Sequence, residues 1–272
     1  MAVADGEQDG IALSPTAAVH SRCLALSPHS DDVAFSLGAA LLDGRFCDLT
    51  VVTVFSVSSC TDEDSGMGTA RVTELRKQED KAFFGTMRKR PQTIYLDRLD
   101  APLRLNIPEE DVCKMVSGRA DGVEVEQLAD CLVRTMQEKV VLMAPLGLGS
   151  HVDHLIAHRA ACLMMRYGYA VAFYEDLPYA AEMPLSAIKS TADKVARSSS
   201  TALTPILIRS KADSSVKAAA VKAYQSQTDT RTITRIITHG LRLGGDIIVE
   251  RLWCNGKALQ LIQDNLSAKA ML

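Results

Sequence analysis

Five short apolar runs, separated by segments long enough to form helices, constrain the fold of this chain more than any other feature. The runs lie at Cys23–Leu26, Leu49–Phe55, Thr93–Leu96, Val140–Ala144 and Ala170–Tyr174. Apolar runs of this length, several of them rich in valine, are typical of strands buried on both faces. Helical character marks the intervening segments Val72–Phe84 and Val125–Glu138. This alternation indicates an α/β fold with a mostly parallel central sheet flanked by helices.

The rest of the chain indicates one domain preceded by a tail. A length of 272 residues suits a single α/β domain, and 47% hydrophobic with 23% charged content is ordinary for a globular protein. We expect residues 1–21 to form a flexible tail and residues 22–272 to form the domain. Within the domain, residues 189–205 are polar and indicate connecting chain, residues 214–228 indicate a helix, and residues 246–254 indicate a late strand.

Charge and composition argue against several classes of partner. A net charge of -3 supplies no general field for attracting nucleic acid, and 5% aromatic residues leave little for stacking on bases. No stretch approaches the roughly 18 apolar residues of a membrane span, so we expect no such span. Seven cysteines without a C-x-x-C pair are typical of free thiols in a reducing compartment, which predicts a cytoplasmic location. The sequence indicates no particular oligomeric state.

A first polar cluster follows the first apolar run, in "SPHSDD". His29 and Asp32 are three positions apart at the predicted start of a helix, so both side chains can face one point, and Asp31 between them points elsewhere. A metal ion held by His29 and Asp32 would leave Asp31 as a free carboxylate nearby. The alternative is that Asp31 and Asp32 only cap the helix.

A second polar cluster follows the fourth apolar run, in "HVDHLIAH". His151, His154 and His158 are spaced by three and four positions, so adjacent pairs can face one point on a helix, and spacing alone does not select among them. Both clusters lie at strand ends of the predicted sheet, where binding sites of such folds gather. The acidic segment 56–68 after the second run is expected to border the same crevice.

One histidine of the second cluster, joined to His29 and Asp32, would complete a set of two imidazoles and one carboxylate. This set is typical of catalytic zinc sites with open positions, and also of iron(II) oxygenases. The spare carboxylate of Asp31 favours hydrolysis, because it can take a proton from water activated by the metal. A spare histidine could stabilise the resulting oxyanion.

The two clusters together resemble the signature of the LmbE/PIG-L family of metal-dependent de-N-acetylases, which is P/A-H-x-D-D followed far downstream by H-x-D-H. "SPHSDD" and "HVDH" match it, and weaker similarity at "RKQEDKAFFG", "YEDLPYA", "KAAAVKAYQSQ" and "ERLW" extends the resemblance from about residue 22 to about residue 254. Ser30 and Val33 depart from the proline and glutamate of many members, as expected of a divergent branch. The resemblance implies a Rossmann-like sheet with its site at the switch point.

The resemblance also implies roles for the residues of both motifs. It makes His29, Asp32 and His154 the zinc ligands and Asp31 the general base. His151 would stabilise the oxyanion and protonate the leaving amine. Asp153 would orient a histidine through a hydrogen bond.

Four further residues are candidates for substrate contact, with weaker support. Arg71 and Arg76 follow the acidic segment and could bind an anionic or hydroxyl-rich group. Tyr174 and Asp176 follow the fifth run, where hydrogen bonds to sugar hydroxyls are expected.

The expected protein is a Zn²⁺-dependent amidohydrolase that removes an acetyl or other acyl group from an amino sugar or glycoconjugate of the N-acetylglucosamine type. Fe²⁺ or another divalent ion could replace zinc. Two competing hypotheses are an iron(II) oxygenase with the same ligands and a sugar-binding protein without catalysis. The presence of Asp31 beside the ligands argues against a pure binder, which needs no base.

Overall fold

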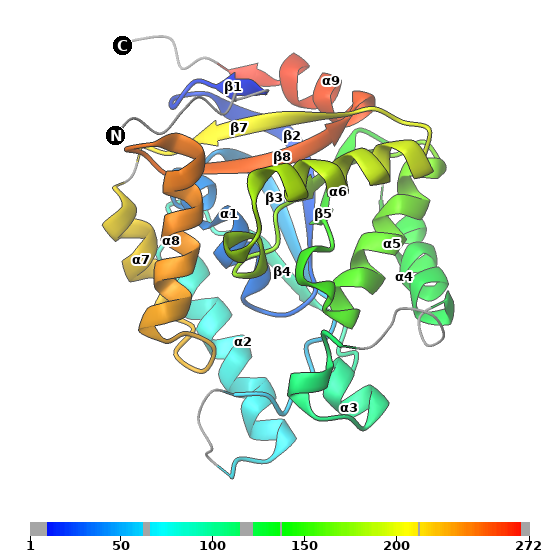
Figure 1. Ribbon diagram of the computed structural model, residues 1–272, viewed down its shortest axis with the longest axis vertical. Helices are drawn as coiled ribbons and strands as arrows, with labels where there is room; N and C mark the ends of the chain where they lie inside the picture. Colours follow the sequence, from blue (N-terminus) through cyan, green and yellow to red (C-terminus); the bar gives the residue numbers. More distant parts are fainter. Residues whose placement is uncertain (1–9, 62–65, 115–121, 137, 212, 268–272) are drawn as a thin grey trace.

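The computed structural model describes residues 10–61, 66–114, 122–136, 138–211 and 213–267, which build one nine-stranded sheet with helices on both faces (Figure 1). The strands are β1 (Ile11–Leu13), β2 (Ala18–Ser27), β3 (Phe46–Thr53), β4 (Gln92–Tyr95), β5 (Val140–Pro145), β6 (Ala170–Tyr174), β7 (Leu203–Arg209), β8 (Val249–Asn255) and β9 (Leu266–Ser267). Every residue of β5 and β6 is buried, as expected for continuous apolar runs covered on both sides. No helix in the described ranges is long and apolar enough to cross a bilayer.

The sheet has the order β1-β7-β8-β6-β5-β2-β3-β4, and β9 pairs with β2. Five pairings are parallel: β1 with β7, β2 with β3, β2 with β5, β3 with β4, and β5 with β6. β8 runs antiparallel to both of its neighbours, β6 and β7. The prediction of a mostly parallel α/β sheet flanked by helices is confirmed.

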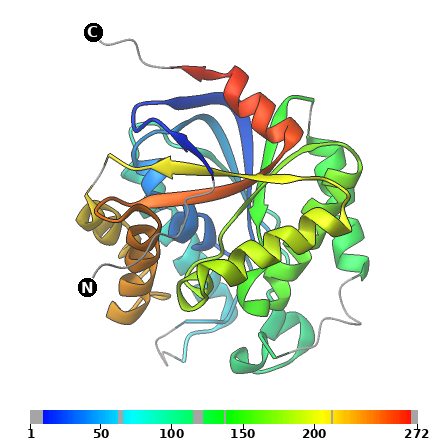
Figure 2. The same cartoon turned by 45° about the horizontal axis from the view of Figure 1, so that its top comes forward.

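The helices are α1 (Asp32–Leu42), α2 (Thr69–Gly85), α3 (Ala101–Leu105), α4 (Gly122–Thr135), α5 (Val152–Arg166), α6 (Leu185–Ser198), α7 (Ser214–Val221), α8 (Thr230–Gly244) and α9 (Gly256–Asp264), with short 3-10 turns η1 (Glu109–Asp111), η2 (Leu148–Ser150) and η3 (Tyr179–Glu182). α1 packs on α7 and α7 on α8, whereas α4 packs on α5 (Figure 1). α9, red in Figure 2, packs on β2, β5, β6 and β8.

The strand order reverses between the neighbouring strands β2 and β5, because the strands that follow them are added on opposite sides. From β2 the chain passes through α1 to β3, toward one edge, and from β5 through α5 to β6, toward the other. Because such crossovers are right-handed, α1 and α5 cover opposite faces and a crevice opens between the carboxyl ends of β2 and β5. Both polar clusters follow these two strand ends.

Five predicted strands and the late strand are present, but two other predictions are wrong. Residues 1–21 are not all tail: β1 pairs with β7, and β2 begins at Ala18, while residues 1–9 lie outside the described ranges. The polar segment 189–205 contains most of α6 and the start of β7 rather than only connecting chain. α6 has one buried apolar stripe, Ile188, Ala192 and Val195, which its many polar residues conceal in the sequence.

Candidate active site

The first polar cluster occupies the tight connection from β2 to α1. β2 ends at Ser27, Asp31 is the N-cap residue of α1, and Asp32 begins the helix. The backbone N–H of His29 donates to Asp32 Oδ2 at 2.7 Å, which fixes the two ligand candidates relative to each other. The Asp31 side chain makes no capping bond, so the interpretation that it only caps α1 does not hold.

The second cluster begins α5. β5 ends at Pro145, the chain turns through η2, and His151 is the N-cap residue of α5, whose second and third residues are Asp153 and His154. Gly149 within this turn has φ +79°, and a Cβ there would lie 2.3 Å from the ring of Tyr179. Only glycine suits this position, because both the backbone conformation and the close ring exclude a side chain.

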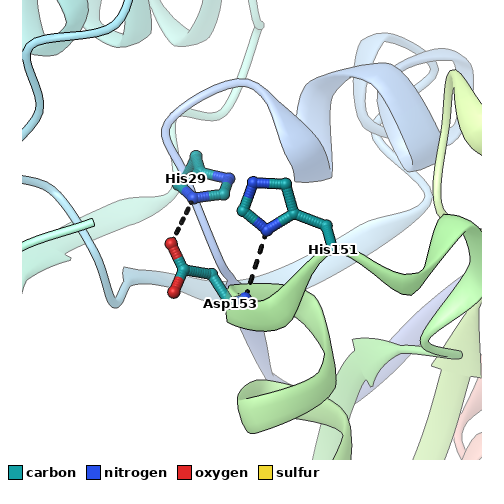
Figure 3. Close-up of side chains that lie close together, drawn as sticks. All are labelled: His29, His151 and Asp153. Carbon is teal, nitrogen blue, oxygen red and sulfur yellow. Dashed lines mark hydrogen bonds and ion pairs between the residues drawn. The ribbon is translucent and has the colours of Figure 1, made fainter. Parts of the chain in front are cut away.

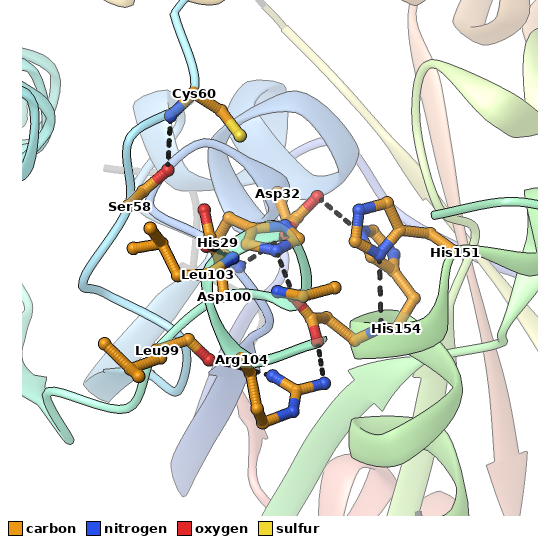
Figure 4. A network of polar contacts seen from close by, with 12 residues as sticks. His29, Asp32, Ser58, Cys60, Leu99, Asp100, Leu103, Arg104, His151 and His154 are labelled. Carbon is orange, nitrogen blue, oxygen red and sulfur yellow. Dashed lines mark hydrogen bonds and ion pairs between the residues drawn. The ribbon is translucent and has the colours of Figure 1, made fainter. Parts of the chain in front are cut away.

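His29, Asp32 and His154 converge on one point between the two strand ends. Their donor atoms lie within 4.8 Å of one another. Each carboxylate oxygen of Asp32 faces one imidazole: Oδ2 lies 3.4 Å from His29 Nδ1, and Oδ1 lies 3.1 Å from His154 Nε2 (Figure 4). Two ring nitrogens and a carboxylate thus point inward from opposite sides of the crevice.

The outer nitrogen of His29 is held by Asp153, which is fully buried. His29 Nε2 lies 3.0 Å from Asp153 Oδ2 (Figure 3). Arg104 Nη2 donates to the other oxygen of Asp153 at 2.7 Å, and the backbone N–H of Ala101 donates to Oδ2 at 2.9 Å. The hydrogen bond predicted between Asp153 and a histidine is present, and α3 holds it in place.

The outer nitrogen of His154 is held by Asp176, at the end of β6. Asp176 Oδ1 lies 2.8 Å from His154 Nδ1, and its Oδ2 accepts from the backbone N–H groups of Gly147 and Leu148 at 3.0 and 3.1 Å. A carboxylate on the outer nitrogen orients an imidazole and raises its basicity, which is the usual support of a metal-binding histidine. Both imidazoles therefore have fixed inward nitrogens.

The residues present fit a divalent metal. Burial lowers the pKa of His29, but hydrogen bonds to Asp153 and Asp32 outweigh it and raise the pKa to about 9. Burial likewise opposes a charge on His154, yet Asp32 and Asp176 raise its pKa well above the usual range. The carboxylates thus favour positive charge at this point, and an N, N, O donor set of this kind suits zinc with open positions. A second grouping, His29, His151 and Asp153, is less suitable because Asp153 already binds Arg104 and a backbone N–H.

Asp31 lies beside this donor set and pairs with a cation of its own. Arg76 Nη2, on α2, donates to Asp31 Oδ1 at 3.0 Å, and Arg76 Nη1 donates to Ser58 Oγ at 3.3 Å. Burial raises the pKa of the Asp31 carboxyl, against the opposing effect of Arg76. The pair leaves Asp31 Oδ2 as the oxygen available to a neighbouring water.

His151 stands over the other two imidazoles, with ring centroids 4.9 Å from His29 and 5.2 Å from His154. Its Nδ1 accepts from the backbone N–H of Asp153 at 3.1 Å (Figure 3). Burial, followed by His29 and His154, lowers the pKa of His151 well below the usual value. Because Nδ1 accepts the bond from Asp153, the ring carries its proton on Nε2, which makes Nε2 a hydrogen-bond donor.

A cavity of about 260 Å³ opens above these residues. Its floor is His29, Asp31, Asp32, His151 and His154, and its walls include Cys60, Arg76, Asp100, Glu109, Glu110, Cys113, Tyr179 and Gln227. This volume lies just below the range of ordinary small-molecule sites, roughly 300–1,000 Å³. The predicted border at segment 56–68 is present at Cys60, while residues 62–65 lie outside the described ranges.

The substrate-contact candidates are divided by the structure. Arg76 lines the cavity, whereas Arg71 is exposed on α2 and absent from the cavity lining. Tyr174 is fully buried, with its hydroxyl donating to Leu26 O, and Asp176 is fully buried against His154. Of the four candidates, only Arg76 lines the cavity within the described ranges, and substrate contact by Arg71, Tyr174 and Asp176 stays a prediction without support from this geometry.

Sequence reasoning missed several residues that complete the site. Arg104 supports Asp153, and Asp100, Glu109 and Gln227 line the cavity. None belongs to either motif, and their partners are distant in sequence. The run of acidic residues "EED" at 109–111 was the one signal in the sequence for a cavity wall here. Such runs usually lie on a solvated surface.

Comparison with known proteins identifies a relative and a shared fold. No protein-family model matches the chain. The chain is 30% identical over 245 residues to 2'-N-acetylparomamine deacetylase from Streptomyces fradiae. The alignment covers 87% of this chain and 82% of that protein.

Solved structures share the fold at lower identity. A deacetylase of teicoplanin biosynthesis, in complex with teicoplanin, has a TM-score of 0.59 and 19% identity, covering 86% of this chain and 98% of that one. GalB, the 4-carboxy-2-hydroxymuconate hydratase of Pseudomonas putida, has a TM-score of 0.51 and 17% identity, covering 86% and 95%. The fold alone therefore does not select the reaction. The extent and identity of the sequence match show that the chain belongs to the deacetylase family that includes 2'-N-acetylparomamine deacetylase.

Proposed function

We propose that this protein is a zinc-dependent hydrolase of the LmbE/PIG-L type that removes the N-acetyl group from an amino sugar or a small glycoconjugate. The observation that carries the proposal is the convergence of His29, Asp32 and His154 within 4.8 Å, with Asp31 beside them at the floor of a cavity. The 30% identity to a deacetylase supports the same reaction class.

His29, Asp32 and His154 would hold the ion, with Asp153 and Asp176 orienting the two imidazoles. A divalent cation supplies Lewis-acid chemistry: it polarises the acetyl carbonyl and lowers the pKa of water toward about 7. Zinc is the proposed ion because two imidazoles and one carboxylate with open positions are a common catalytic zinc set.

Asp31 acts as the general base. It takes a proton from the attacking water as the water oxygen bonds to the acetyl carbon. Arg76 holds Asp31 Oδ1, which leaves Oδ2 as the oxygen that can accept the proton. Because Asp31 is buried, its affinity for the proton is higher than that of an exposed aspartate.

His151 stabilises the oxyanion that forms on the carbonyl oxygen. The backbone N–H of Asp153 fills His151 Nδ1, so Nε2–H is the donor that can reach the oxyanion. As the C–N bond breaks, the leaving nitrogen takes the proton that Asp31 removed from water. His151 is the group proposed to deliver this proton to the leaving amine, as the family resemblance implies. The products are acetate and a free amine.

The proposed substrate is a small N-acetylated amino sugar, since the relative is named for 2'-N-acetylparomamine and the cavity is small. A cytoplasmic location is proposed with it. All seven cysteines are free thiols, which fits a reducing compartment.

Release of free amine from N-acetylglucosamine conjugates and 2'-N-acetylparomamine tests this function. Zinc-loaded wild type and Asp31→Asn are compared, with the metal content of each measured. We expect wild type to turn over, and Asp31→Asn to retain one zinc per chain while losing activity by at least about a hundredfold.

The other outcomes separate the competing hypotheses. Absence of bound metal from both proteins overturns the assignment of the site. Tight binding of N-acetyl sugars without turnover indicates a sugar-binding protein. Activity with Fe²⁺ and oxygen, but none with redox-silent zinc, indicates an oxygenase.

A further inference from the structure

We infer that the cavity selects substrates that carry a positively charged amino group in addition to the acetylated nitrogen, and that Asp100, Glu109, Glu110 and Gln227 bind that group. The inference rests on the proposed function and concerns the wall of the cavity away from His29 and His154. It adds a charge requirement that the deacetylation chemistry does not itself impose.

The charges of the cavity lining are unequal. Five carboxylates line the cavity, namely those of Asp31, Asp32, Asp100, Glu109 and Glu110, and Arg76 is the one lysine or arginine among the lining residues. Asp31 pairs with Arg76, and Asp32 would offset one of the two charges of a divalent ion, which leaves one positive charge at the floor. Asp100, Glu109 and Glu110 add three negative charges, so the outer wall is negative.

Asp100 is a nearly buried carboxylate with an unfilled position. It is 2% exposed, and its Oδ1 accepts from the backbone N–H of Leu103 at the start of α3. Its Oδ2 has no hydrogen-bond partner among the described residues, although the residue lines the cavity. This oxygen is not one of the fully buried atoms without a partner, so it is open to the cavity, where a ligand can donate a hydrogen bond to it.

Glu109 and Asp100 both act electrostatically on the Cys60 thiol, so the two carboxylates lie on the same side of the cavity. Burial, then Asp100, then Glu109 raise the pKa of the Cys60 thiol to about 12. Glu109 and Glu110 lie on η1 at the exposed mouth of the cavity, and within the described ranges neither forms a salt bridge. Glu109 shares a hydrogen bond with the Cys60 thiol and Glu110 lies near Lys114, but both carboxylates are exposed, so a cation at the entrance can reach them.

Gln227 presents an acceptor to the cavity. Its Nε2 donates to Cys60 O at 3.1 Å and to Ser226 O at 2.7 Å, which leaves its carbonyl oxygen Oε1 for a ligand. Glu79 on α2 fixes this segment, because its two carboxylate oxygens accept from Ser226 N and Ser226 Oγ, both at 2.7 Å. The amide is thus held with its donor turned to the protein.

The wall therefore offers three carboxylates and an amide oxygen, all of them acceptors. Hydroxyl groups can donate to such a wall, but only an ammonium group also compensates its charge. Amino sugars joined to an aminocyclitol carry such groups, whereas neutral N-acetylglucosamine glycosides do not.

The test compares two substrates that differ only in charge: 2'-N-acetylparomamine, and its analogue in which hydroxyls replace the unacetylated amines. We expect the kcat/KM of zinc-loaded wild type to be at least roughly tenfold higher for the charged substrate, mainly through KM, and the preference to fall as salt is raised. Glu109→Gln with Glu110→Gln should reduce the preference about tenfold. Glu126→Gln, an exposed carboxylate on α4, is the matched control and should leave it unchanged.

Equal kcat/KM for the two substrates, or a preference that survives in the double variant, overturns this inference while leaving the deacetylase intact. Turnover of neither substrate counts against the proposed function itself. Gln227→Glu supplies a second readout, because an added negative charge should increase the preference, whereas a purely structural residue would lower activity toward both substrates equally.

Discussion

At the scale of single residues, Asp176 supports the metal site from outside both motifs. It is fully buried and accepts from His154 Nδ1 and from two backbone N–H groups. Removing such a partner usually costs ten- to a hundredfold in metal affinity. We expect Asp176→Asn to weaken zinc binding by about that factor, measured by competition with a chromogenic chelator.

Tyr174→Phe is the control for this substitution. Tyr174 is equally buried and is the last residue of β6, two positions before Asp176, but its hydroxyl donates to Leu26 O rather than to a metal-binding side chain. Its loss should lower stability and leave zinc affinity unchanged. Wild-type zinc affinity in Asp176→Asn would show that His154 is oriented by other contacts.

At the scale of elements, α2 joins the active site to two distant parts of the chain. It carries Arg76 to Asp31, and its Asp80 accepts from the hydroxyls of Tyr95 on β4 and Tyr224 after α7, at 3.0 and 2.8 Å. Burial raises the pKa of Asp80 to about 7, although both tyrosine hydroxyls oppose this rise. The helix is thus attached through a carboxyl that titrates near neutral pH.

The folded protein holds the Asp80 proton more tightly than the unfolded chain, in which the pKa is about 3.9. The stabilisation from this group is therefore complete below about pH 4 and is lost as pH rises to about 7, at up to about 1.4 kcal/mol per pH unit.

Asp80→Asn should remove this dependence, so the free energy of unfolding of wild type relative to the variant should decline across that range. Denaturant unfolding at several pH values measures it. Asp130→Asn, exposed on α4, is the control, and parallel curves for wild type and Asp80→Asn would contradict the assignment.

At the scale of the whole molecule, the metal site connects two halves of the sheet. The connection from β2 to α1 supplies His29 and the first residue of α1 supplies Asp32, whereas α5 after β5 supplies His154. Because only the folded chain brings these ligands together, bound zinc should stabilise the fold. At a zinc concentration of 100 times Kd the gain is about 2.7 kcal/mol, or a rise in Tm of roughly 5–10 °C.

Thermal unfolding of the zinc-loaded and chelator-treated protein checks this expectation. Asp32→Asn should show little zinc-dependent change in Tm, because the shared carboxylate of the site is lost. The same rise in Asp32→Asn would place the stabilising ion at a different site.

The sequence by itself determined the features that depend on neighbouring residues. Apolar runs located β2 to β6, since burial on both faces leaves a continuous apolar signal. The spacing in this motif predicted that His29 and Asp32 face one point while Asp31 points elsewhere. Side-chain directions over so few residues depend only on the local backbone geometry. Placing both motifs at strand ends then followed from the topology of parallel sheets.

Only the tertiary structure decided which distant groups meet. Asp176 was predicted to contact substrate, but the pairing of β5 with β6 brings it to His154 instead. Arg76 reaches Asp31 from another helix, and Asp100 and Glu109 reach the cavity from a segment without a motif. A carboxylate or guanidinium has the same letter in the sequence whether its partner is water, a substrate or a buried imidazole. Burial and proximity between distant segments select the partner, and both arise only when the chain is folded.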